Sequence, residues 1–375
     1  MVKRIDVIQL VRGIGALLVC LFHFKGLLNT STSHLGTTLF GNGAIGVSLF
    51  FIISGFIMVY TTRKSDGSAL YVKNFMIKRL IRIIPLYYIM VLFWVFAYDT
   101  NLDYFSKDFM TLVKTFCFVP IFDSPAGPAY GMPPLKVGWS LNYELFFYLI
   151  IGISLFMKRF RWGMLFATFA GLIIMIPLFS RGFVSFHPSN NYHFGFPYLS
   201  LMTNPVMLYL VMGVALGLLY DSTFSIRSKW LQTGLLVLSI ALFFLLYFKV
   251  LPFTGNFFAL LFVCSFLFFG LLFFNKERGI KVPAVFVYLG NMSYSLYLIH
   301  PTVIIVLPRF LRLFGVVGEL DRILRFFVLI AFTLVLSILS YEFIEKRLLK
   351  RLATFLTTPR IKKTPVKLQL IEVKE

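Results

Sequence analysis

The sequence is poor in charged residues, and acidic side chains are the scarcest of them. Of 375 residues only 14% are charged, with 15 Asp and Glu against 36 Lys and Arg, while 59% are hydrophobic. A chain this apolar fits neither an ordinary soluble domain nor a disordered segment. Its long apolar runs, separated by short basic gaps, predict an all-α polytopic membrane protein.

Cysteine is scarce as well. The three cysteines, Cys20, Cys117 and Cys264, show no C-x-x-C spacing, so neither a disulfide framework nor a thiolate metal site is indicated. A packing role is favoured for Cys20 over an acylated thiol, because buried cysteines behave as small apolar side chains. The sequence also lacks H-E-x-x-H, Walker and dinucleotide-binding motifs, and we expect no metal cofactor.

The net charge of +21 does not indicate a nucleic-acid partner. The basic residues lie in the gaps between apolar runs, where membrane topology already accounts for them. At the N-terminus, Lys3 and Arg4 precede an apolar run as in a signal peptide, but Asp6, Arg12 and His23 interrupt the run and no A-x-A site follows. We therefore expect a retained first helix.

About ten apolar runs are long enough, or nearly so, to span a membrane. They cover residues 7–28, 43–61, 83–98, 139–157, 162–179, 200–220, 231–248, 256–274, 286–308 and 325–345. With the N-terminus inside, 25 of the 36 Lys and Arg lie in cytoplasmic segments, which predicts that both termini are cytoplasmic in a multi-pass protein of the inner (plasma) membrane. We expect one membrane domain, residues 1–352, followed by a basic cytoplasmic tail, residues 353–375, attracted to anionic membrane lipids.

Two ionisable residues interrupt the first apolar run. Arg12 and His23 are eleven residues apart, so on a helix they share one face, roughly 16 Å apart along the axis. Charged groups at this depth are costly and usually mark an interior functional site. A purely structural pair, satisfied by neighbouring helices, is the alternative.

A basic cluster precedes the third run. Arg79 and Arg82 share a helix face at i and i+3, and Arg63 and Lys78 lie nearby. Arginine suits phosphate because its planar group offers several donors. The cluster is a candidate site for a phosphate-bearing donor, although positive-inside topology alone gives a similar pattern.

Other polar residues fall within the spans. Ser54 lies mid-membrane in a Ser-Gly pair, where it either permits close packing or lines a channel for a slender chain. Glu144 enters the fourth run at a depth similar to that of His23, so the two are a candidate carboxylate and base. Candidate acceptor-binding residues are Trp139 and Asn142 in the same block and Tyr297 and His300 in the ninth run. The outer segment 99–138 suits a lid or an acceptor groove, and segment 180–199 suits either a carbohydrate surface or an ordinary interfacial belt.

Nearly the whole chain resembles the acyltransferase-3 family of integral membrane acyltransferases, nearest to its exopolysaccharide and O-antigen branch. The motifs that carry the resemblance are Gln9–Gly13 with His23, Gly46–Phe56, Arg79-Leu80-Ile81-Arg82 with Pro85–Tyr88, Gly138–Glu144 and Ser293–His300. The resemblance implies transfer of an acyl group, usually acetyl from acetyl-CoA, to a hydroxyl of a polysaccharide or lipid-linked oligosaccharide. It also implies that His23 is catalytic, that Arg12, Arg79 and Arg82 bind the donor, and that Glu144 supports the histidine.

These expectations combine into a hypothesis. The CoA phosphates lie on Arg79 and Arg82, and the pantetheine arm runs past Arg12 and Ser54 to present the acetyl group near His23. His23 deprotonates the acceptor hydroxyl, although an acetyl-histidine intermediate is an alternative. A transporter or flippase of lipid-linked saccharides, with the buried charges lining its path, is a different class that also fits them.

Overall fold

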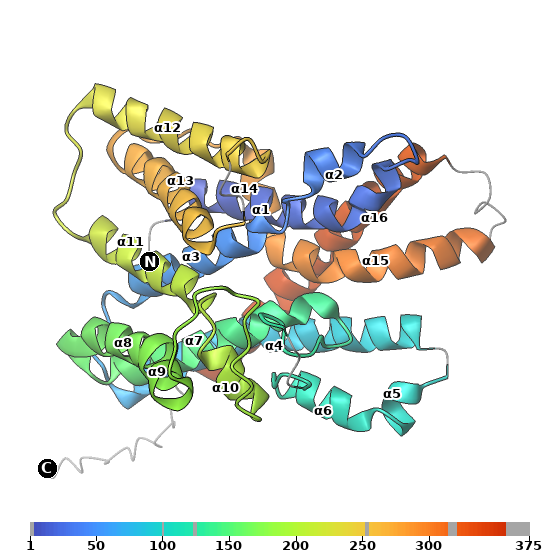
Figure 1. Cartoon of the computed structure of the whole chain (residues 1–375), viewed down its shortest axis with the longest axis horizontal. Coiled ribbons are helices and arrows are strands. Elements are labelled where there is room, and N and C mark those ends of the chain that lie inside the picture. Colours follow the sequence, from blue (N-terminus) through green and yellow to red (C-terminus); the bar gives the residue numbers. More distant parts are fainter. Residues whose placement is uncertain (1–3, 100, 123–125, 252–254, 314–320, 358–375) are drawn as a thin grey trace, which may run out of the picture.

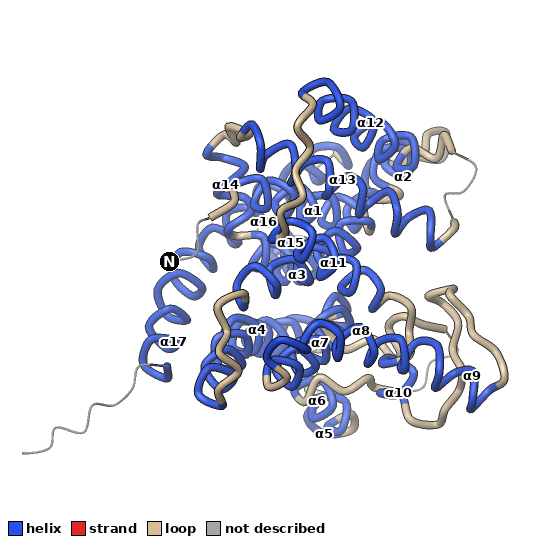
Figure 2. The backbone as a smooth tube through the Cα atoms, turned by 90° about the vertical axis from the view of Figure 1, so that its left-hand side faces the viewer, coloured by secondary structure: helices blue, strands red, loops and turns tan. Residues whose placement is uncertain are grey.

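A computed structural model describes residues 4–99, 101–122, 126–251, 255–313 and 321–357, and all regular structure within these ranges is helical (Figures 1 and 2). Eight helical segments are long and apolar enough to cross a membrane, and a ninth is added if the bent pair α14 (Ala284–Asn291) and α15 (Ser293–Leu313) forms one span. The shorter α11 (Met207–Asp221) is also apolar. The predicted all-α polytopic fold is confirmed.

The other long helices form the body of the bundle. They are α1 (Asp6–Phe24), α3 (Ile45–Thr62), α4 (Ala69–Tyr98), α7 (Trp139–Leu155), α8 (Arg161–Ala170), α12 (Lys229–Tyr247), α13 (Phe257–Arg278) and α16 (Arg322–Ser340). Shorter elements connect or extend them: η1 (Lys25–Leu28), α2 (Leu35–Phe40), α5 (Asp103–Ser106), α6 (Phe109–Phe116), η2 (Lys136–Gly138), η3 (Lys158–Phe160), η4 (Gly171–Met175), α9 (Ile176–Arg181), α10 (Pro197–Met202), η5 (Tyr341–Leu349) and α17 (Lys350–Thr357).

The third span is longer than its apolar run suggested. The sequence predicted a marginal span at 83–98 after a connection at 62–82, but α4 already begins at Ala69, where the Ser68 hydroxyl accepts a hydrogen bond from the backbone N–H of Tyr71 at 3.2 Å. The basic residues of the first turns hide this part of the helix from a hydropathy scan. Arg79 and Arg82 therefore lie within a 30-residue helix, and the helix face that they were predicted to share is continuous with the third span.

Close helix contacts depend on paired glycines. A Cβ on Gly213 of α11 would lie 2.0 Å from the Ile52 carbonyl oxygen, and one on Gly55 of α3 would lie 2.0 Å from the Leu210 carbonyl oxygen. Glycines permit this approach because they lack Cβ. The packing interpretation of the Ser-Gly pair in α3 therefore holds for Gly55.

The predicted ninth span is broken rather than continuous. The helix bends by 67° between α14 and α15. On α14, Gly290 packs so closely on α1 that a Cβ there would lie 2.1 Å from the Gln9 carbonyl oxygen. The break allows α14 to pack on the start of α1 while α15 begins beside Arg12.

The connections 99–138 and 180–199 pack on each other and on the turn before α11 through hydrogen bonds. The backbone N–H of Gly127 donates to the Ser189 carbonyl at 3.0 Å, and the Asn204 amide donates to the Pro188 carbonyl at 2.8 Å. After α4, the backbone N–H of Tyr104 donates to Asp99 at 2.7 Å, which lowers the pKa of that carboxyl. The role of segment 99–138 as a lid or acceptor groove stays a prediction.

The first residues of the predicted cytoplasmic tail are helical. Helix α16 continues through the π-helical segment η5 into α17, so residues 353–357 of the predicted tail are helical. The rest of that tail, 358–375, lies outside the described residues.

Candidate active site

A narrow cavity of about 60 Å³ lies between α1, α3, α4, α7 and α15. Six residues predicted separately from sequence share its wall: Arg12, Ser54, Arg79, Arg82, Glu144 and Tyr297. The apolar part of the wall comes mainly from α3, which contributes Val47, Phe50, Phe51, Ile53, Ile57 and Met58. The cavity is therefore a slender apolar slot with a concentration of positive charge.

Two of the three arginines, Arg12 and Arg79, have polar but uncharged hydrogen-bond partners. Arg12 Nη1 donates to the Gln9 side-chain oxygen at 3.4 Å, and Arg79 Nη2 donates to the Thr61 hydroxyl at 2.9 Å. In the described part of the chain, no carboxylate lies within 4.0 Å of any of the three guanidinium groups. Buried charges normally pair, so this arrangement favours an anionic ligand.

Glu144 belongs to the arginine side of the cavity. Its Oε1 accepts a hydrogen bond from the Ser54 hydroxyl at 2.7 Å and another from the Tyr148 hydroxyl one turn further along α7. Among the described residues no hydrogen bond joins it to His23. The expected carboxylate–histidine pair is therefore not formed, because equal depth in the membrane does not decide which helices are neighbours.

His23 instead meets a second histidine. It lies exposed near the end of α1, where its Nδ1 is 2.8 Å from the Val19 carbonyl oxygen and 3.3 Å from Nε2 of His300. The two ring centroids are 4.9 Å apart. His300 is fully buried on α15, and its Nδ1 is 3.1 Å from the Leu296 carbonyl oxygen.

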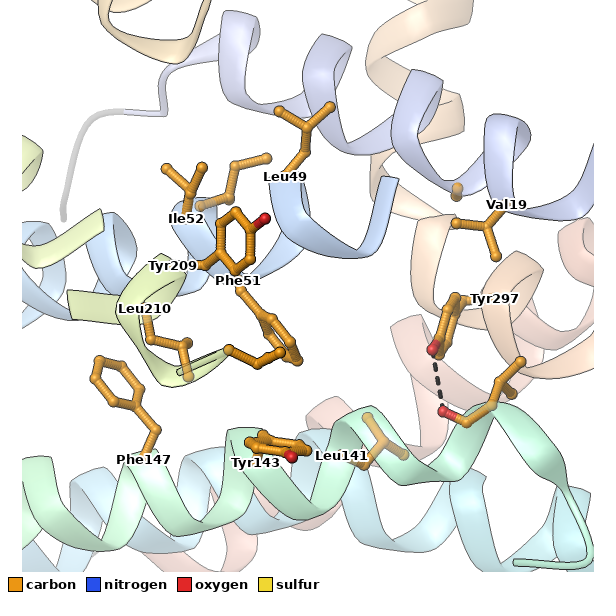
Figure 3. Close-up of a cluster of buried hydrophobic side chains, with 14 of the residues drawn as sticks. Val19, Leu49, Phe51, Ile52, Leu141, Tyr143, Phe147, Tyr209, Leu210 and Tyr297 are labelled. Atoms are coloured by element: carbon orange, nitrogen blue, oxygen red, sulfur yellow. Dashed lines mark hydrogen bonds between the residues drawn. The ribbon is translucent and has the colours of Figure 1, made fainter. Parts of the chain in front are cut away.

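Tyr297 connects the cavity to the histidine pair. It lines the cavity, and its ring centroid is 6.0 Å from that of His300. Its hydroxyl donates to the Val137 carbonyl at 3.0 Å, the hydrogen bond drawn as a dashed line in Figure 3, and lies 2.8 Å from the Ser140 hydroxyl on α7. The arginines and the histidine pair are therefore separate clusters joined through one aromatic wall.

Four predicted site residues lie elsewhere. Arg63 approaches Asp221 at 3.7 Å, and Lys78 is exposed on α4. Trp139 packs against the rings of Phe51 and Tyr143, and Asn142 is buried on α7 without lining the cavity. These four residues do not line the cavity, and their predicted roles in donor and acceptor binding stay predictions.

Two polar residues near the site, Tyr148 and Glu345, were not predicted, and Ser293 was named only as the first residue of the Ser293–His300 motif. Tyr148 was recognisable in principle, because it follows Glu144 by one helical turn. Ser293 lines the cavity, and its hydroxyl is buried without a hydrogen-bond partner. Glu345 of η5 accepts a hydrogen bond from the backbone N–H of Ser295 at 3.1 Å, but no local pattern connects two residues fifty positions apart.

A membrane bundle with arginines around a slender slot and a histidine beyond it fits group transfer at the membrane. The family model described as "Acyltransferase domain" matches residues 5–342, and the chain belongs to this family of membrane acyltransferases.

Named relatives agree with this assignment. The exopolysaccharide production protein ExoZ of Rhizobium meliloti is 29% identical over 322 residues, covering 82% of this chain and 90% of that protein. A Staphylococcus aureus (strain COL) protein named "Putative O-acetyltransferase" is 27% identical over 342 residues, which cover 83% of this chain and 54% of the Staphylococcus protein. The Bacillus subtilis "Putative peptidoglycan O-acetyltransferase YrhL" is 25% identical over 370 residues, covering 85% and 52%. The chain thus spans most of the first relative and about half of the other two, and no solved structure matches it.

Proposed function

We propose that the protein is an O-acetyltransferase of the inner (plasma) membrane. It transfers an acetyl group from cytoplasmic acetyl-CoA to a hydroxyl of an extracytoplasmic polysaccharide or lipid-linked oligosaccharide. The observation that carries the proposal is the shared cavity, which joins arginines and polar side chains from five helices into one slender slot. The printed names of ExoZ and the peptidoglycan relative support a polysaccharide acceptor.

The donor end is the arginine end of the cavity. Arg79 and Arg82 bind the CoA phosphates, since guanidinium groups recognise phosphate with several donors at once. The pantetheine arm follows the apolar wall of α3 past Arg12 and Ser54. The slot is narrow and apolar along α3. A slender chain enters such a slot more readily than a saccharide does, and this favours the donor as its occupant.

The acceptor end is at His23. His23 takes the proton of the acceptor hydroxyl, and that oxygen attacks the thioester carbonyl carbon. The carbon–sulfur bond then breaks, the acetyl group stays on the acceptor oxygen as an ester, and the CoA sulfur takes the proton from His23. Atoms and charge balance without a metal or a redox partner.

The test is release of free CoA thiol that depends on a glycan acceptor, measured with purified protein in detergent or nanodiscs. Replacing His23 by Ala should lower this release by at least about a hundredfold, the usual contribution of a general base. His34→Ala is the matched control, because His34 is exposed in a loop beside α2.

Mass spectrometry of the surface polysaccharide should then show acetylation in cells with the unmutated protein or His34→Ala and none with His23→Ala at equal membrane levels. Wild-type acetylation by a folded His23→Ala protein contradicts the proposal. An unchanged glycan mass combined with altered export of the saccharide would instead support the transporter alternative.

A further inference from the structure

His300 is a buried histidine, and its surroundings differ from those expected of an acceptor-binding residue. The sequence predicted that it binds the acceptor, but its side chain is 0% exposed and both its ring nitrogens already have partners. A saccharide cannot reach such a ring directly. His23, one contact away, is exposed.

Carbonyl oxygens fix the protons on the two rings. A carbonyl only accepts hydrogen bonds, so the nitrogen facing it carries the proton. Nδ1 of His23 faces the Val19 carbonyl at 2.8 Å, and Nδ1 of His300 faces the Leu296 carbonyl at 3.1 Å. In the neutral form of each ring, Nε2 is therefore the bare nitrogen.

In the hydrogen bond between the two rings, His23 is therefore the donor and His300 the acceptor. The bare Nε2 of His300 lies 3.3 Å from Nδ1 of His23, so the Nδ1–H of His23 is shared between Val19 and His300. We propose, on the basis of the proposed acetyl transfer, that His300 is a positioning residue that holds His23 with its Nε2 free to act as the base.

This arrangement also suits the charged state of His23. When Nε2 of His23 takes the acceptor proton, its Nδ1–H becomes a charged and stronger donor to His300. A second proton on His300 would set two N–H groups against each other, so His300 stays a neutral acceptor. The charged groups near His23 are Lys25 and Lys136, and neither replaces this acceptor because both are donors.

Packing keeps the His300 ring in place. Its centroid is 6.0 Å from the ring of Tyr297 and 6.4 Å from that of Phe24, each in an edge-to-face contact. Tyr297 is itself held by the Val137 carbonyl. The orientation of the base thus depends on the same tyrosine that forms part of the cavity wall.

Two substitutions of matched polarity test the inference. The Gln amide reaches about as far from the backbone as Nε2 of histidine, whereas the Asn amide reaches only as far as Nδ1. His300→Gln therefore keeps an acceptor for His23, and His300→Asn removes it. We expect His300→Asn to lower kcat by at least about tenfold with the acceptor KM unchanged, and His300→Gln to retain most of the activity.

The pH profile separates positioning from general damage. Loss of the acceptor destabilises charged His23, so the acidic limb of kcat/KM should move to lower pH in His300→Asn and stay near its wild-type place in His300→Gln. Equal kcat for His300→Asn and wild type, or equal losses in both variants with no movement of the limb, overturns the inference. An inactive wild type with every acceptor tested would instead overturn the proposed function.

A measurement on the unmutated protein covers the case in which the variants do not fold. Diethylpyrocarbonate modifies bare histidine nitrogens, and peptide mass analysis identifies the modified residue. We expect modification of His23 and none of His300. His300 should be protected although its Nε2 is bare, because that nitrogen is buried and accepts from His23. Equal modification of both residues would contradict this contact.

Discussion

Arg79 and Arg82 face the cavity, whereas Lys78 beside them is exposed on the same helix. We predict that Arg79→Gln combined with Arg82→Gln weakens CoA binding by at least tenfold, because a hydrogen bond to a charged group contributes about 1.5–3 kcal/mol. Titration calorimetry in detergent measures the affinity. Lys78→Gln should bind CoA as the unmutated protein does.

A different pattern would contradict this site. If the double variant binds with unchanged affinity, the phosphates lie elsewhere. If Lys78→Gln weakens binding as much as the double variant, the effect is a general one of surface charge, and it should then disappear at high salt.

The sequence identified individual site residues better than it identified the residues that they contact. Arg12, Ser54 and Glu144 stand out because polar groups are costly at lipid depth, and all three line the cavity. Their partners did not follow from the sequence. The contact of His23 with His300 joins residues 277 positions apart, and only the packing of α1 against α15 brings them together.

Helix α11 approaches α3 through glycine. We predict that Gly213→Ala destabilises the protein by about 1–3 kcal/mol, the usual cost of overpacking, because its Cβ would lie 2.0 Å from the Ile52 carbonyl oxygen. Thermal unfolding in detergent measures the change. Gly163→Ala on α8 is the control, since a Cβ there meets nothing within 4 Å. Equal melting temperatures for the two variants would show that the α3–α11 contact is looser than described.

The ends of the helices were predicted less well from hydropathy than the helices themselves. Hydropathy located most of the spans, because apolar length is what the membrane selects. It missed the start of α4, whose first turns carry basic residues, and the break between α14 and α15, which follows from the close approach of Gly290 to α1. Neither feature has a signal in apolar content alone.

For the molecule as a whole, the orientation in the membrane is still a prediction from charge. In a Cys117→Ser background the remaining cysteines, Cys20 and Cys264, are buried. We expect a membrane-impermeant maleimide to label Ser189→Cys in intact cells and Lys64→Cys only after permeabilisation, because both termini should be cytoplasmic. The reverse pattern would place the arginine end outside and would contradict the donor path.

The separation of Arg12 from His23 along α1 has a kinetic consequence. With the proposed donor path, the two substrates approach from opposite faces, so free CoA should compete with acetyl-CoA but not with the acceptor. The ratio of acetylated to free CoA in the cytosol then sets the rate of modification even when glycan is abundant. In that case the density of acetyl groups on the cell surface follows the ratio of acetyl-CoA to free CoA in the cytosol.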